Sequence, residues 1–99
     1  MTNNEVIASA KIFAICRNAL DKRNEADVSN AQRFPLRFAT QYIKEAHARG
    51  KVTSSIDKQI AVLMDEIDEK TMREEFDKCL TLEQQGAWLM AFMKMSAEE

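Results

Sequence analysis

The sequence predicts an all-α fold, a small bundle of four to five helices in a single domain over residues 1–99. Its composition, 45% hydrophobic and 30% charged, is typical of a chain that folds around a core. Only two glycines and one proline are present, which is too few turn-forming residues for a sheet of many short strands. Apolar residues also recur at helical spacing along most of the chain. Together these observations indicate helices joined by short loops.

The first helix is predicted to begin at Thr2. A Thr-x-x-Glu capping box with Glu5 would satisfy the first backbone amides. The apolar face is formed by Val6, Ala10, Phe13, Leu20 and their neighbours Ile7, Ala14 and Cys16. The helix should end near Lys22. The polar segment from Asp21 to Asn30 is predicted to be a loop, with a short helical turn near residues 26–31 as an alternative.

The second long helix is predicted over residues 35–49. Pro35 suits a first helical turn because it has no amide hydrogen to leave unpaired. Arg49 and Gly50 form a typical stop, with a cation in the last turn and a glycine able to adopt the left-handed conformation.

Three further helix starts are indicated by capping residues. Ser54 with Asp57, or Ser55 alone, is expected to cap a helix with the clearest amphipathic pattern of the chain. Capping boxes at Thr71 and Thr81 are expected to open a short helix and a last helix. The apolar residues of these three helices are Ile56, Ile60, Leu63, Met64 and Ile67, then Phe76 and Leu80, then Leu82, Trp88, Leu89, Phe92 and Met95.

Charge is unevenly distributed along the chain. Residues 1–58 hold ten Lys and Arg against six Asp and Glu, whereas residues 59–99 hold four against ten. The first twenty residues contain no unbroken hydrophobic run, and no segment approaches membrane-spanning length, so we expect a cytoplasmic protein without a membrane contact. In that compartment Cys16 and Cys79 are expected to be reduced thiols, partly buried, rather than a disulfide.

Catalytic and metal-binding motifs are not recognisable in the sequence. His47 is the only histidine, and no nucleophile and orienting group accompany it in a motif, so we interpret it as a surface residue. The cysteines lack the spacing of a zinc site, and the acidic residues lack the spacing of an EF-hand loop. We therefore expect no catalytic residues, no metal and no cofactor.

Two features indicate a surface that binds another protein. The last helix has more apolar residues than one stripe can bury, and Met90 and Met93 are expected to flank the core stripe, where a partner or a second copy of the chain would cover them. The alternative is a closing helix that the bundle buries on all sides. The other feature is acidic. It is the group of carboxylates Asp65, Glu66, Asp68, Glu69, Glu74, Glu75 and Asp77. The simpler interpretation of this group is a solvated helix face, and the functional interpretation is an acidic docking face.

Three short stretches within residues 13–67 resemble the TROVE domain of the Ro ribonucleoproteins. Phe13-Ala-Ile-Cys-Arg-Asn18 is similar to a helix of that family with an apolar run before Arg-Asn. The stretch Ala31-Gln-Arg-Phe-Pro-Leu-Arg-Phe-Ala-Thr-Gln-Tyr42 is similar to its basic, aromatic-or-His, Pro, apolar step into a helix. Gly50-Lys51 and the helix over residues 60–67 lie where the family has a comparable loop and helix.

The resemblance implies RNA binding. TROVE domains are rings of many helical repeats, of which this chain matches only a small part, and the matched basic residues are Arg17, Arg33 and Arg37. Phe34 stands where many family members have His, which departs from the family pattern at a contact position. The pI near 5.5 is below that of a typical RNA-binding domain. We therefore predict a non-catalytic adaptor or inhibitor that binds a larger protein, with RNA binding as the alternative.

Overall fold

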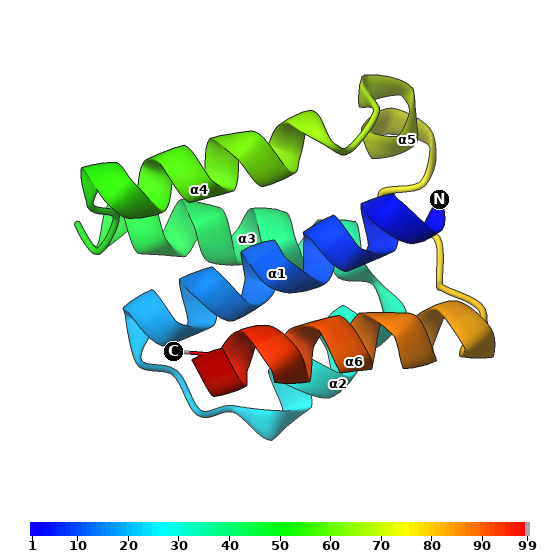
Figure 1. Ribbon diagram of the computed structural model, residues 1–99, viewed down its shortest axis with the longest axis horizontal. Coiled ribbons are helices and arrows are strands. Elements are labelled where there is room, and N and C mark those ends of the chain that lie inside the picture. Colours follow the sequence, from blue (N-terminus) through cyan, green and yellow to red (C-terminus); the bar gives the residue numbers. More distant parts are fainter. Residues whose placement is uncertain (99) are drawn as a thin grey trace.

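Six α-helices and no strand are present in residues 1–98, the part of the chain that the computed structural model describes (Figure 1). The helices are α1 (Asn3–Leu20), α2 (Glu25–Arg33), α3 (Pro35–Ala48), α4 (Ser54–Asp65), α5 (Glu69–Glu74) and α6 (Leu82–Glu98). The predicted all-α bundle is confirmed. Six helices form instead of four to five because the polar segment after α1 becomes a helix of its own.

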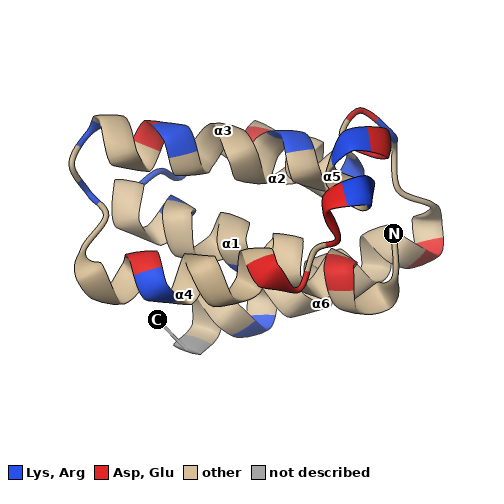
Figure 2. Ribbon diagram, turned by 90° about the horizontal axis from the view of Figure 1, so that it is seen from above, with Lys and Arg blue, Asp and Glu red and all other residues tan. Residues whose placement is uncertain are grey.

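The helices form two layers, which Figure 1 shows from the front and Figure 2 from above. In the front layer α1 lies between α4 and α6, and α3 and α2 lie behind it. Helix α1 packs against α6, α3, α4 and α2, so it is the central element of the fold. A helix in such a position must be apolar on nearly every side.

The sequence of α1 meets that requirement. Eleven of its 18 residues are buried, including three alanines that allow neighbouring helices to approach closely. The exposed part of α1 is a narrow stripe that faces the front, where only Ile7 and Lys11 among its middle residues are partly accessible. Helix α3 covers the rear of α1, while α4 and α6 cover its two sides. The stripe is therefore the part of α1 that is left accessible at the front of the molecule.

An aromatic cluster holds α1, α3 and α6 together. The ring of Phe13 lies 4.4 Å from Tyr42, 5.7 Å from Trp88 and 5.9 Å from Phe92, measured between ring centres. Trp88 and Phe92 are themselves stacked at 5.2 Å. Rings at these separations add specific stabilisation to the burial of their surface. Phe13 from the predicted apolar face of α1 and Trp88 and Phe92 from that of α6 therefore meet in one core. Leu82, which was also predicted on the apolar side of the last helix, is 85% exposed instead.

The predicted helix starts at Thr2 and Thr81 are confirmed. The Glu5 amide donates to the Thr2 hydroxyl at 3.2 Å and the Thr2 amide donates to the Glu5 carboxylate at 2.8 Å. Thr81 and Gln84 exchange the same pair of bonds at 3.2 and 3.3 Å. Helix α3 begins at Pro35 as expected, and Gly50 adopts the left-handed conformation after its end.

The predicted cap of α4 was wrong by one residue. Thr53, rather than Ser54 or Ser55, accepts a hydrogen bond from the Ile56 amide at 3.2 Å. Three consecutive hydroxyl residues offered equivalent caps in the sequence. Among the predicted apolar residues of α4 itself, Ile60 is buried, whereas Ile56, Leu63 and Met64 are only partly covered.

The predicted start at Thr71 was also wrong. Helix α5 begins after Asp68, whose carboxylate accepts a hydrogen bond from the Lys70 amide at 3.0 Å, and Thr71 lies inside the helix. Phe76 and Leu80 lie in the connection after α5 rather than in it. Asp68 is a competing local cap three residues earlier, and its own amide donates to Glu5 of α1 at 2.9 Å, so a tertiary contact favours the earlier start.

Helix α2 is longer than the short turn considered from the sequence. Its start is capped by Asn24, whose side chain accepts a hydrogen bond from the Ala26 amide at 3.0 Å. Its buried face consists of Val28 and Ala31 alone. Asp27 accepts a hydrogen bond from the Tyr42 hydroxyl at 2.5 Å, which joins α2 to α3. Contacts with distant residues, rather than local apolar spacing, stabilise this helix.

Candidate functional site

The acidic residues lie around the turn between α4 and α5 and along the chain that follows, as Figure 2 shows in red. All of the predicted acidic docking residues are exposed except Glu75, which is half-buried. Three of the seven have structural roles. Glu75 pairs with the N-terminal ammonium at 2.8 Å, Asp77 pairs with Arg37, and Asp68 caps α5. The other four, which are Asp65, Glu66, Glu69 and Glu74, form no ion pair with another residue among those described.

Glu5 links this acidic region to α1. It is 5% exposed, and one of its carboxylate oxygens accepts the Asp68 amide at 2.9 Å while the other accepts the Thr2 amide. Burial alone would raise the pKa of Glu5, but these hydrogen bonds lower it more, so the net pKa lies below its ordinary value. Glu5 is therefore a structural carboxylate. Within residues 1–98 no group of three or more His, Cys, Asp or Glu is arranged to hold a metal ion.

Met90 and Met93 are exposed on α6, by 60% and 57% of their surface. On the same helix Trp88 and Phe92 are buried, and Leu89 and Met95 are partly covered. The predicted division of α6 into a core stripe and flanking methionines thus agrees with the burial of these side chains. The two methionines differ in surroundings, because Met90 lines a hollow and Met93 does not.

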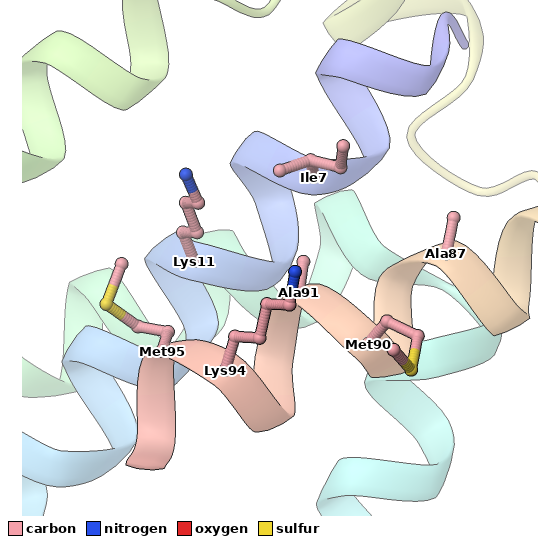
Figure 3. Close-up of a pocket in the computed structure, with 7 residues that line it drawn as sticks. All are labelled: Ile7, Lys11, Ala87, Met90, Ala91, Lys94 and Met95. Atoms are coloured by element: carbon pink, nitrogen blue, oxygen red, sulfur yellow. The ribbon is translucent and has the colours of Figure 1, made fainter. Parts of the chain in front are cut away.

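That hollow lies between α1 and α6 and has a volume of about 390 Å³. Figure 3 shows Ile7 and Lys11 on α1 along one side and residues of α6 along the other. The α6 residues are Ala87, Met90, Ala91, Lys94 and Met95. Among the lining residues only Lys11 and Lys94 have polar side chains.

A second hollow, of about 360 Å³, lies between α1 and α4. It is lined by Lys11, Ile15, Lys58, Gln59, Val62, Leu63 and Met95. Because Lys11 and Met95 line both hollows, the two adjoin across α1. We call the combined depression the α1 groove. Val62, on its α4 wall, is 64% exposed, so an apolar residue is accessible on each side of the groove.

Sequence reasoning missed the α1 groove. The pattern Ile7, Lys11, Ile15 has the four-residue spacing of one helix stripe, but Ile7 was assigned to the apolar face that packs in the core. Nothing in the local sequence around Lys58 or Lys94 distinguishes either lysine from other surface lysines. Only the positions of α4 and α6 beside α1 bring these residues together.

The three arginines of the RNA-binding alternative do not form one patch. Arg17 is mostly buried, with its guanidinium 5.5 Å from the ring centre of Phe92 and 3.8 Å from the first residue of α2, Glu25. Arg33 is the last residue of α2, and Arg37 follows in α3, so helix α2, about 13 Å long, separates them from Arg17. Arg37 is also paired with Asp77.

The remaining titratable candidates are separate from the groove. His47 is exposed on α3 with Nε2 4.0 Å from Asp57, as expected of a surface histidine. Cys16 is buried in α1 and Cys79 is exposed, and both are free thiols. Burial raises the pKa of Cys16 to about 12, which makes it unreactive in the folded protein.

No protein-family model, curated protein or solved structure matches the chain. None of the helices in residues 1–98 combines the length and apolar character needed to cross a membrane.

Proposed function

We propose that this chain is a non-catalytic helical module that acts in the cytoplasm as an adaptor or inhibitor by binding a larger protein. The observation that carries the proposal is the exposure of Met90 and Met93 on a helix whose opposite face closes the core. Methionine side chains are flexible and polarisable, which suits them to contact surfaces. Exposed large apolar residues that cluster beside a hollow are typical of interaction sites.

The acidic residues between α4 and α5 provide a second contact region in this proposal. Asp65, Glu66, Glu69 and Glu74 project into solvent without an ion pair to another described residue. Exposed charges of one sign steer a partner of opposite charge and suppress wrong partners more than they add affinity. The exposed α6 surface around Met90 would supply binding energy and the carboxylates would supply selectivity.

RNA binding is the alternative. It is supported by exposed Arg33 and Arg37, whose neighbour Phe34 lies 5.3 Å from the Arg37 guanidinium and is half-buried. The separation of Arg17 from this pair weakens the alternative. If RNA were the ligand, affinity would fall steeply with salt and would fall further when the three arginines become Ala.

The test is affinity capture from the native cell, with and without nuclease, using the wild-type chain and the double variant Met90→Glu, Met93→Glu. A specific protein captured after nuclease treatment, and lost with the double variant, would support the proposal. Material that disappears on nuclease treatment would favour RNA. Capture of the same protein by both forms of the chain would show that the methionines are not part of the contact surface. Self-association that is lost with the double variant would show that α6 forms a homodimer interface.

A further inference from the structure

The charge of the α1 groove differs from that of the rest of the molecule. Its described lining contains three lysines, Lys11, Lys58 and Lys94, and no acidic residue, although the chain as a whole has a net charge of −2. No ion pair with a described acidic residue involves Lys11 or Lys58. The groove is therefore an apolar depression with a cationic character on an otherwise acidic protein.

We propose that the α1 groove binds one amphipathic helix of a partner protein, with apolar residues toward α1 and Asp or Glu on its flanks. This inference rests on the proposed protein-binding function and specifies the partner's chemistry. Lys11 lies in the middle of the groove, and Lys58 and Lys94 lie on the α4 and α6 sides. Acidic residues on both flanks of a bound helix would face these two sides.

The shape of the groove fits a helix. Its base follows α1 from Ile7 to Ile15, a rise of about 12 Å, which corresponds to just over two helical turns. A partner helix of that length presents apolar anchors at positions i, i+3 or i+4, and i+7, the usual pattern for a helix in a groove. Val62 on the α4 side of the groove and Met90 on the α6 side are both exposed, and they would contact those anchors from the two sides.

A second copy of this chain suits the groove less well. In a two-fold symmetric dimer the same surface of each copy forms the interface. The two groove surfaces would then bring six lysines together, with no acidic side chain among the described lining residues to separate them. Like charges placed together across an interface oppose association. An acidic helix from a different protein balances the same charges.

The test uses two synthetic helical peptides of about 16 residues that share leucines at i, i+4 and i+7. One peptide carries Glu at the flanking positions and the other carries Lys. Binding is measured by fluorescence anisotropy, and the methyl groups of the methionines are followed by NMR. We expect the Glu-flanked peptide to bind at least about tenfold more tightly than the Lys-flanked one. The methyl signals of Met90 and Met95 should shift, and that of Met93 should not.

Matched variants locate the contact. Met90→Glu should weaken binding of the Glu-flanked peptide, whereas Met93→Glu, an equally exposed change on the same helix, should not. Lys11→Glu lowers the charge of the lining lysine positions from +3 to +1, so it should reduce the preference for the Glu-flanked peptide, and Lys44→Glu on α3 should leave that preference unchanged. The thermal midpoint of each variant is recorded, so that a loss of binding is interpreted only for variants that fold. The comparison of the two peptides uses the wild-type chain and therefore does not depend on any variant folding.

Several outcomes would overturn the inference. These are equal affinity for both peptides, no binding of either at millimolar concentration, shifts confined to Met93, or a concentration-dependent dimer that Met90→Glu abolishes. The proposed function fails separately, when capture yields no protein partner. A captured partner that still binds the Lys11→Glu and Met90→Glu variants would retain the proposed function and place its contact outside the groove.

Discussion

Helix α1 and the α4–α5 segment, residues 54–74, differ in how many of their residues are buried. Eleven residues of α1 are buried, whereas α4 buries only Ile60 and α5 buries none. The buried residues of the segment are Ile60 and Ile67, and a hydrogen bond from the Asp68 amide to Glu5 ties it to α1. Regions with few buried contacts open at lower free-energy cost than the core. One wall of the α1 groove, α4, is thus the less firmly held part of the molecule.

The largest expected difference between core and periphery is in the alkylation rates of the two cysteines. Cys16 lies within α1 and becomes reactive only when the core opens, while Cys79 is exposed in the connection after α5. If Cys16 opens only with global unfolding, a stability of about 5 kcal/mol or more predicts labelling at least about a thousandfold slower than at Cys79. Timed alkylation at pH 8 followed by mass spectrometry checks this. Similar rates at both thiols would mean that α1 opens locally.

Phe13→Ala should be the most damaging single substitution. Phe13 is fully buried and contacts the rings of Tyr42, Trp88 and Phe92, so the change removes the centre of the aromatic cluster. We expect a loss of about 3–5 kcal/mol in the free energy of unfolding, measured by urea denaturation. The matched change Phe76→Ala, at a half-buried site after α5, should cost less than half as much. Equal losses would contradict the contrast between the two regions.

Glu5→Gln should weaken the link between α1 and α5. The amide side chain retains only one acceptor oxygen for the two backbone donors, Thr2 and Asp68, so we expect a loss of about 1–3 kcal/mol in the free energy of unfolding. Hydrogen exchange should accelerate in α5 and at the end of α4 more than in α3. Uniform acceleration across all helices would show that Glu5 stabilises the whole core instead.

The same carboxylate predicts a pH dependence. Because the pKa of Glu5 is lower in the folded than in the unfolded protein, ionised Glu5 stabilises the fold at pH values above its unfolded pKa. That contribution is lost as the pH falls through the folded pKa, which means below about pH 4.5. Unfolding curves recorded from pH 6 downward should therefore show a shallower decline for Glu5→Gln than for the wild-type chain.

Met90→Glu with Met93→Glu should have the smallest effect on stability. Both side chains are more than half exposed, and substitutions at such sites change the free energy of unfolding by within about 0.5 kcal/mol. The thermal midpoint of the monomer should stay nearly constant while partner capture is lost. A variant that unfolds would assign the methionines to the core and leave the acidic residues between α4 and α5 as the remaining docking candidate.

Much of the fold was predictable where local chemistry decides it. Pro35 and Gly50 bound α3 because each has a backbone preference that few other residues share. The boxes at Thr2 and Thr81 form because their partners, Glu5 and Gln84, lie within the same turn. The prediction failed at Thr71, where the local box competes with a cap at Asp68 whose amide is bonded to Glu5 of α1.

The candidate site divides in the same way. Helical periodicity within α6 alone identified Met90 and Met93 as outward-facing, since the neighbouring Trp88 and Phe92 define the core side. The pairing of Asp77 with Arg37, which joins residues forty positions apart, was not predictable from either segment.

By itself the sequence determined the helical class, the ends of the helices with strong local caps and the outward side of α6. It did so because those properties depend on residues within one or two turns of each other. Only the tertiary structure decided which helices flank the exposed stripe of α1. The α1 groove joins Lys11, Lys58 and Lys94 from three helices, and their proximity follows from the packing of α4 and α6 on either side of α1.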